Sequence, residues 1–223
     1  MKWVRRMLPL LFLAAVVGFG LFGATKRQSY PDITSQPDYT DRLAVALLPE
    51  EACTMAAQQM IEELPQSPII ALVTPTSDLV PQFYSCKQRF YVQQVYAGEE
   101  LKKSDMIWIT DPELCVLPWG DGYGSLNCGF VNPPQQGQEY LVFLSGEVEI
   151  VDGWDDLPTY QLRDDLMLSP VLCCNDWNTQ VDPESSTYLK DMRWQEFFTQ
   201  TQQGMDTLME AKHQVMEQFP QEN

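Results

Sequence analysis

The chain has 223 residues, 44% of them hydrophobic, which is enough to bury a core without disulfides and argues against global disorder. Residues 1–27 hold five Lys or Arg and no acid, so the rest of the chain carries nine basic against 31 acidic residues. Such a surface repels phosphate backbones, which argues against nucleic-acid binding, and it suits a soluble exported domain.

The first predicted element is a membrane segment. Residues 7–24 carry no charge, and as a helix they span roughly 27 Å, close to the roughly 30 Å of a bilayer core. The basic N-terminus predicts export of the body. Because the cleavage site is weak, residues 1–27 are predicted to be an uncleaved signal-anchor, giving a single-pass cell-membrane protein with its C-terminal domain extracytoplasmic. The alternative is secretion after signal cleavage.

A polar stretch and a helix follow. Residues 28–48 are predicted to be a linker, because they are polar and contain prolines. "LPEEACTMAAQQMIEELPQ" predicts a helix that starts at Pro49 with two glutamates in its first turn, and that Pro65 ends.

Strand-like segments make up the middle of the chain. The apolar or alternating runs are residues 68–76, 86–101, 105–110 and 139–146. Weaker strands are expected at "EVEIVDG", "TYQLRDD" and "MLSPVLC". Short strands separated by Gly and Pro turns predict a small antiparallel barrel or sandwich, and we assign residues 49–186 to this helix-plus-barrel domain.

The last segment, residues 187–223, predicts a long amphipathic helix. It begins near Asp191, with Gly204 as a possible kink. Its stripe runs at helical spacing and packs on the barrel or on the first helix, the alternative being a partner-binding or self-associating helix. The stripe comprises Trp194, Phe198, Thr201, Met205, Leu208, Lys212, Val215 and Phe219.

Six cysteines suggest disulfides in an exported protein. Cys115 and Cys128 bracket a Gly-rich loop and are the candidate pair. Adjacent Cys173 and Cys174 could bond to different partners, bridge each other or stay reduced. A zinc site lacks the usual ligand spacing, since there is no Cys-x-x-Cys pair and one histidine.

The middle of the chain resembles the netrin-like OB-fold barrels, the class that includes tissue inhibitors of metalloproteinases, and similar exported domains of Gram-positive bacteria. The matching residues are "FYVQQVYAGEEL", "DMIWIT" and Cys128-Gly129 followed by "GQEYLVFLSG", within about residues 69–146. The resemblance implies an OB-like barrel for this part of the chain. With the helices and membrane segment predicted above, the expected fold is α+β: a small antiparallel OB-like β-barrel flanked by an N-terminal helix and a long C-terminal amphipathic helix, behind an N-terminal transmembrane helix. Inhibitors of this class use an N-terminal cysteine to reach zinc, and residues 25–52 contain none.

Few residues suggest chemistry. His213 and Glu217 share a helix face, but two ligands do not make a metal site. Acid pairs at Asp152, Asp155 and Asp156, and at Asp164 and Asp165, could bind calcium or serve a hydrolase, although solvated turns explain them as well. Catalytic and cofactor motifs do not occur, so we expect no cofactor.

One loop is a candidate binding site. Trp119 and Tyr123 lie beside flexible glycines in residues 118–129, where exposed aromatics can bind a peptide or glycan, or else fold over the barrel end. The function expected is therefore a non-enzymatic, membrane-tethered domain that contacts the membrane through residues 7–24 and binds a protein or cell-surface partner. The alternatives are an exported hydrolase with paired carboxylates and an assembly protein acting through its C-terminal helix.

Overall fold

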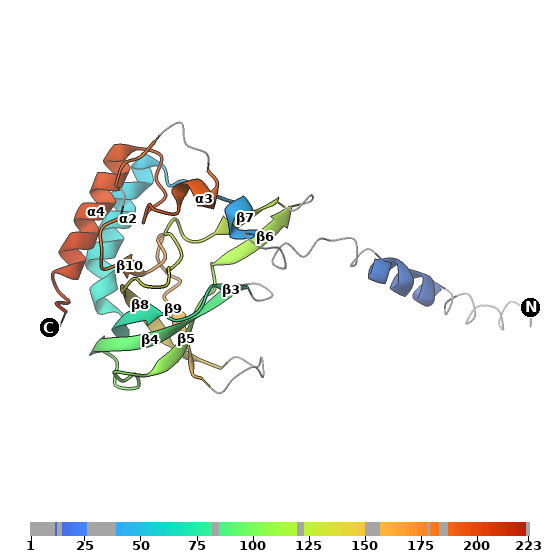
Figure 1. The fold of residues 1–223 in the computed structure, drawn as a ribbon, viewed down its shortest axis with the longest axis horizontal. Helices are drawn as coiled ribbons and strands as arrows, with labels where there is room; N and C mark the ends of the chain where they lie inside the picture. Colours follow the sequence, from blue (N-terminus) through green and yellow to red (C-terminus); the bar gives the residue numbers. More distant parts are fainter. Residues whose placement is uncertain are drawn as a thin grey trace, which may run out of the picture.

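The protein combines a closed β-barrel with helices, and this α+β class confirms the prediction (Figure 1). The computed structural model describes residues 12, 15–25, 39–81, 85–119, 123–149, 157–177, 179–182 and 187–221. In Figure 1 the helices α2 and α4 lie side by side against one side of the barrel, and the strands β6 and β7 lie on the other side of the molecule.

Five strands close the barrel in the order β2–β4–β5–β9–β8 and back to β2. Their inward side chains form one core, with Phe90, Val92, Ile107 and Ile109 among them. β5 lies between β4 and β9, as its two apolar faces predict. The bounds are β2 Ile69–Pro75, β4 Cys86–Ala97, β5 Met106–Asp111, β8 Tyr140–Val148 and β9 Thr159–Leu162.

The prediction of an antiparallel barrel is wrong at one pairing. β5 and β9 are parallel, with Trp108 opposite Thr159, whereas the other four pairings are antiparallel. A parallel pair requires a connection longer than a hairpin, and here β6, β7 and β8 lie between the two strands in the chain. Two short strands extend the sheet: β10, Val171–Cys173, pairs with β8, and β3, Val80–Pro81, pairs with β4.

A second sheet of three strands lies beside the barrel. β1, Leu43–Val45, pairs in parallel with β7, Tyr123–Asn127, which pairs with β6, Cys115–Trp119. The linker prediction for residues 28–48 is therefore wrong from residue 39 onward, where a short 3₁₀ helix, η2 Tyr39–Arg42, precedes β1. Leu43, Val45 and Leu48 are buried, and burying these side chains ties the segment to the fold.

The two long helices pack on each other. α2, Glu50–Glu63, ends in the 3₁₀ turn η3, Leu64–Gln66, and follows the prediction closely. The C-terminal helix α4 spans Gln202–Met216 with Thr201 as its N-cap, and its apolar side packs against α2 as one core. For the apolar residues of the stripe from Met205 onward, packing on the first helix is thereby confirmed.

The C-terminal helix is shorter than predicted. Only a single turn, α3 Leu189–Met192, forms near Asp191, and the residues between α3 and α4 are irregular. The backbone of this irregular segment bonds to distant parts of the chain. Leu48 N donates to Phe198 O, and Phe198 N donates to Phe130 O. These tertiary hydrogen bonds replace the helical ones that the periodicity favoured.

The predicted transmembrane helix receives no support. Residues 15–25 are helical, but within the described part of the chain no helix is long and apolar enough to span a bilayer. Residues 1–11, 13 and 14 of the predicted anchor lie outside the described residues.

Candidate functional site

A surface groove of about 300 Å³ runs between η2, β7, the turn after α3, and the loop 132–135. Its floor is apolar, with Leu43, Leu79, Leu126 and Leu189, and two consecutive prolines form one wall. This volume is at the lower end of the range for ligand pockets in proteins. The groove is therefore large enough to hold a few residues of an extended chain.

Asn132 holds the two walls of the groove together. Its side-chain amide donates to the backbone oxygens of Arg193 at 2.9 Å and of Gln195 at 2.8 Å, and its backbone N–H donates to Glu196 O at 2.8 Å. Gln135 adds a bond from Nε2 to Arg193 O at 2.9 Å. Because Asn132 is buried and its side-chain N–H groups are bonded to the backbone of the opposite wall, the groove is formed before any partner arrives.

The groove carries positive charge in a strongly acidic chain. Lys190 and Arg193 line it together with one acid, Asp41. Arg193 lies over the ring of Trp194 at 5.4 Å, and Lys190 lies over the ring of Tyr188 at 5.7 Å. Among the described residues, neither cation takes part in an ion pair.

Trp194 stands at the edge of this groove. Its side chain is 61% exposed, the largest exposure of any aromatic residue in the folded body that the structure describes. The helical stripe predicted from the sequence includes Trp194, and the prediction is wrong at this residue because the helix begins only at Gln202. Trp and Arg are enriched among the residues that carry most of the binding energy at protein interfaces.

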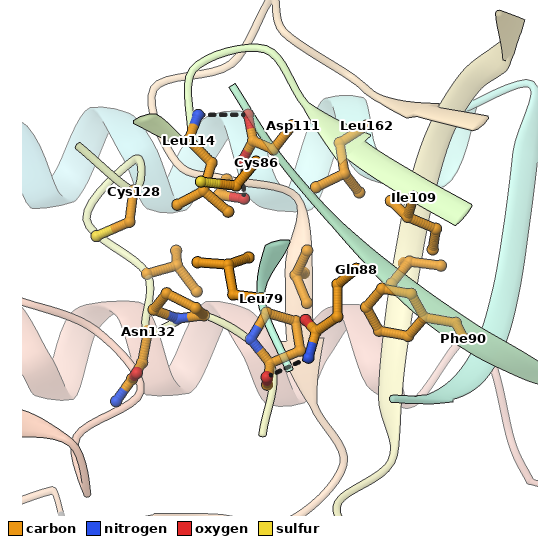
Figure 2. A pocket seen from close by; sticks show the side chains of 16 residues that line it. Leu79, Cys86, Gln88, Phe90, Ile109, Asp111, Leu114, Cys128, Asn132 and Leu162 are labelled. Atoms are coloured by element: carbon orange, nitrogen blue, oxygen red, sulfur yellow. Dashed lines mark hydrogen bonds between the residues drawn. The ribbon is translucent and has the colours of Figure 1, made fainter. Parts of the chain in front are cut away.

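A small cavity lies beneath the groove, at one end of the barrel (Figure 2). It has a volume of about 30 Å³, and four residues border both spaces: Leu79, Asn132, Pro133 and Pro134. Gln88 reaches into it from β4, where its Nε2 donates to Ser77 O at 2.9 Å and Pro134 O at 3.0 Å. Its Oε1 is buried and has no hydrogen-bond partner in the described part of the chain.

Asp111 forms the polar wall opposite. Oδ1 accepts from the backbone N–H of Glu113 and Leu114, and Oδ2 accepts from the hydroxyl of Ser169 at 2.9 Å. Burial raises the pKa of Asp111, and these three hydrogen bonds oppose the rise. Gly129 makes the arrangement possible, because at φ +53° it approaches Ser169 so closely that a Cβ would lie 2.7 Å from Ser169 N.

None of the six cysteines is bonded to another in the structure, so the predicted Cys115–Cys128 disulfide is not seen. In the β6–β7 hairpin Cys115 lies opposite Asn127, the last residue of β7, and Cys128 is the first residue after that strand. Burial and the nearby Cys115 and Asp111 raise the pKa of Cys86 to about 12. Burial and Asp111 likewise raise the pKa of Cys128 to about 12, so neither thiol supplies a thiolate nucleophile near pH 7.

The predicted binding loop is described only in part. The backbones of Trp119 and Tyr123 pair at the ends of β6 and β7. Their side chains and residues 120–122 lie outside the described part of the chain, as do the predicted acids Asp152, Asp155 and Asp156.

In the other predicted acid pair, Asp165 forms a salt bridge and Asp164 accepts a hydrogen bond from Gln161 Nε2 at 3.2 Å. Asp165 binds Arg163 at 2.6 Å, and this hydrogen bond lowers the pKa of Asp165. Arg163 also lies 3.5 Å from Glu63, which links β9 to the end of α2. A carboxyl group with a lowered pKa is poorly suited to act as a general acid, so this pair does not favour a hydrolase.

His213 lies against Asp176, not Glu217. Its Nε2 is 3.0 Å from Asp176 Oδ1, and the neighbouring Lys212 is fully buried between Asp176 and Glu196. Cys174 borders the same surface depression, but burial is the main cause that raises its pKa to about 12. The cluster therefore resembles a structural ion network more than a cysteine–histidine catalytic site.

Sequence reasoning missed the residues that make the groove. The run Lys190 to Trp194 was the available signal, because it sets two cations beside an aromatic residue in a chain that is poor in cations. No local pattern distinguishes Gln88, whose role depends on the carbonyl groups around it. Comparison of the sequence with models of known protein families found no match, and comparison with curated proteins found none either.

Proposed function

We propose that this protein is a non-enzymatic binding domain that holds an extended, acidic segment of a partner protein in the groove beside Trp194. The observation that carries this proposal is the pair of cations, Lys190 and Arg193, which lack ion-pair partners among the described residues and border an exposed Trp. Carboxylates of a partner would pair with the two cations, and the Trp ring would supply apolar contact area.

Charge complementarity argues for an acidic occupant. The chain has a formal net charge of −17, so most of its surface repels an acidic peptide. A groove with two cations and one acid is a local exception, and it attracts such a peptide to one place. The apolar floor then favours a segment in which acidic and apolar side chains alternate, as they do along an extended strand.

Binding is favoured over catalysis by the state of the nucleophiles. The thiols of Cys86, Cys128 and Cys174 have pKa values of about 12, and His213 is held by Asp176.

We further propose that the barrel is of the OB type and related to the netrin-like barrels. In support, its five strands close through a parallel pairing of the third and fifth strands. We retain the proposal that residues 1–27 tether the domain outside the cell membrane.

The groove can be tested with synthetic peptides and the full chain. Fluorescein-labelled decapeptides would alternate Leu and Val with Glu, Gln or Lys, and binding would be followed by anisotropy. We expect the Glu peptide to bind most tightly and to weaken as salt rises from 50 to about 500 mM, because surface ion pairs are screened. Trp194→Ala should weaken binding at least tenfold, as expected for a central interface residue.

Charge reversal provides the matched control. Arg193→Glu should reduce binding of the Glu peptide at least tenfold and improve binding of the Lys peptide. Lys102→Glu, which makes the same charge change at an exposed turn between β4 and β5, should leave both affinities within twofold. Equal binding of the Glu and Lys peptides, or equal effects of the two variants, would refute the proposed function.

A further inference from the structure

Among the described residues that line the barrel-end cavity, one has a buried acceptor without a donor. Gln88 is 4% exposed, and its Oε1 has no hydrogen-bond partner among the residues that the structure describes. The orientation of this amide is fixed by its surroundings, because Nε2 lies between two carbonyl oxygens, those of Ser77 and Pro134. Exchanging the nitrogen and oxygen would set an acceptor against two acceptors, so the unpaired atom is the oxygen.

The other polar groups of the cavity are already engaged. Asp111 accepts two backbone N–H groups and the hydroxyl of Ser169. The remaining walls are mostly apolar, with Phe90, Ile109 and Val142 among them (Figure 2). An occupant must therefore bring one hydrogen-bond donor for Gln88 and otherwise present carbon atoms, since an unpaired buried acceptor and an unpaired buried charge are both unfavourable.

The size of the cavity limits that occupant further. About 30 Å³ has room for roughly two water molecules, or for a group of two or three non-hydrogen atoms. The side-chain ends of serine and threonine have this size and carry one hydroxyl donor. Lysine, tyrosine and amide side chains are larger, so they do not fit without movement of the walls.

The groove places a partner above this cavity. Leu79, Asn132, Pro133 and Pro134 border both spaces, so the groove and the cavity adjoin at these four residues. We propose that the cavity is a subsite for a hydroxyl-bearing short side chain, serine or threonine, of the segment held in the groove, with its hydroxyl donating to Gln88 Oε1. This subsite rests on the proposed function for the origin of its occupant.

The subsite can be tested without knowing the partner. Ethanol, which is the side chain of threonine as a free molecule, would be titrated into the full chain while NMR follows the side-chain amide of Gln88 and the methyl groups of Val142. Acetonitrile is the matched probe, because it also has three non-hydrogen atoms but no donor. We expect saturable shifts with ethanol, with a dissociation constant no tighter than about 1 mM, and at least tenfold weaker binding of acetonitrile.

Two variants test separately the hydrogen bond to Gln88 and the volume of the cavity. Gln88→Met removes the acceptor and should abolish the preference for ethanol over acetonitrile. Val171→Ile adds one methylene to a wall of the cavity and should weaken both probes at least fivefold while keeping Gln88. If Gln88→Met does not fold, two measurements still test the subsite. They are the ratio of the dissociation constants of ethanol and acetonitrile in the unaltered chain, and the change in both constants caused by Val171→Ile.

Trp194→Ala distinguishes this proposal from the proposed function. It should leave ethanol binding unchanged although it weakens the acidic peptide. Absence of saturable shifts, equal binding of ethanol and acetonitrile, or a cavity that retains only a bound water in excess ethanol would overturn the subsite. If the subsite and the groove act together, a Glu decapeptide in which one Val is replaced by Thr should bind more tightly than the parent peptide.

Discussion

Lys212 is the residue at which burial and charge conflict most strongly. Its side chain is fully buried, and Nζ binds Glu196 Oε2 at 2.5 Å, Asp176 Oδ1 at 3.2 Å and Asn175 O at 3.2 Å. These three contacts use all three protons of the ammonium group. Glu196 in turn accepts the backbone N–H of Cys173, so the pair links α4, β10 and the segment before α4. It positions the segment whose carbonyl groups bind Asn132 in the groove.

Removing the cation should be strongly destabilising. In Lys212→Met, Glu196 is left buried without its partner, which typically costs about 3–5 kcal/mol of unfolding free energy. Adding Glu196→Leu to the same chain should recover part of the loss, because the uncompensated charge is gone. Urea unfolding of the two chains measures both effects. If the double variant were no more stable than Lys212→Met, the ion pair would not be the cause.

At the scale of elements, the contact between α2 and α4 depends on a glycine. Gly204 is buried in the first turn of α4, and a Cβ there would lie 2.7 Å from Cys53 Sγ on α2. The sequence suggested a kink at Gly204. In the structure Gly204 instead allows α2 and α4 to approach closely. Its backbone N–H also donates to the side-chain oxygen of the N-cap residue Thr201. Periodicity identifies the apolar side of a helix but not the distance to its neighbour.

Gly204→Ala tests this contact. Alanine is the better helix former by about 1 kcal/mol, yet we expect a net loss of about 1–3 kcal/mol because the methyl group overpacks the interface. Thermal unfolding provides the measurement. Cys53→Ala in the same chain removes the clashing sulfur and should restore stability, whereas Gln203→Ala on the exposed side should change little. A stabilising Gly204→Ala would show that the helices do not need this approach.

Element prediction worked where a pattern is local. α2 is recovered because prolines and first-turn glutamates mark its ends, and the barrel strands because their apolar residues recur at the spacing of a strand. It was wrong at residues 193–201, where the helical stripe is present but the backbone bonds to Leu48 and Phe130. The competing hydrogen bonds come from distant parts of the chain, so no window of sequence contains them.

At the scale of the whole molecule, acid groups make stability depend on pH. Burial raises the pKa of Glu196 to about 7 from an ordinary value of 4.5, although Lys212 opposes the rise. The folded state therefore binds more protons than the unfolded state between these values. This contribution is fully present below pH 4.5 and is lost as pH rises through 7. The pKa values of Asp165 and Asp176 are lowered, so these two groups change the free energy of unfolding only at lower pH.

We expect the free energy of unfolding to fall by about 3 kcal/mol between pH 4.5 and 7.5. The buried Asp111 carboxyl, whose pKa is also raised, changes stability in the same direction. Urea unfolding at a series of pH values measures the slope, and Glu196→Gln should flatten it because the amide does not titrate. A stability that rises across this range would contradict the assignment to Glu196.

The sequence by itself determined the α+β class, the first helix and the strands of the barrel, because side-chain periodicity records which residues face a core. Only the tertiary structure decided the groove and the cavity beneath it. Asn132 and Arg193 are 61 residues apart, and Gln88 and Pro134 are 46 apart, yet hydrogen bonds join both pairs. Such sites arise from chain closure, and the polar atoms that define them have partners, or lack them, only after the barrel has formed.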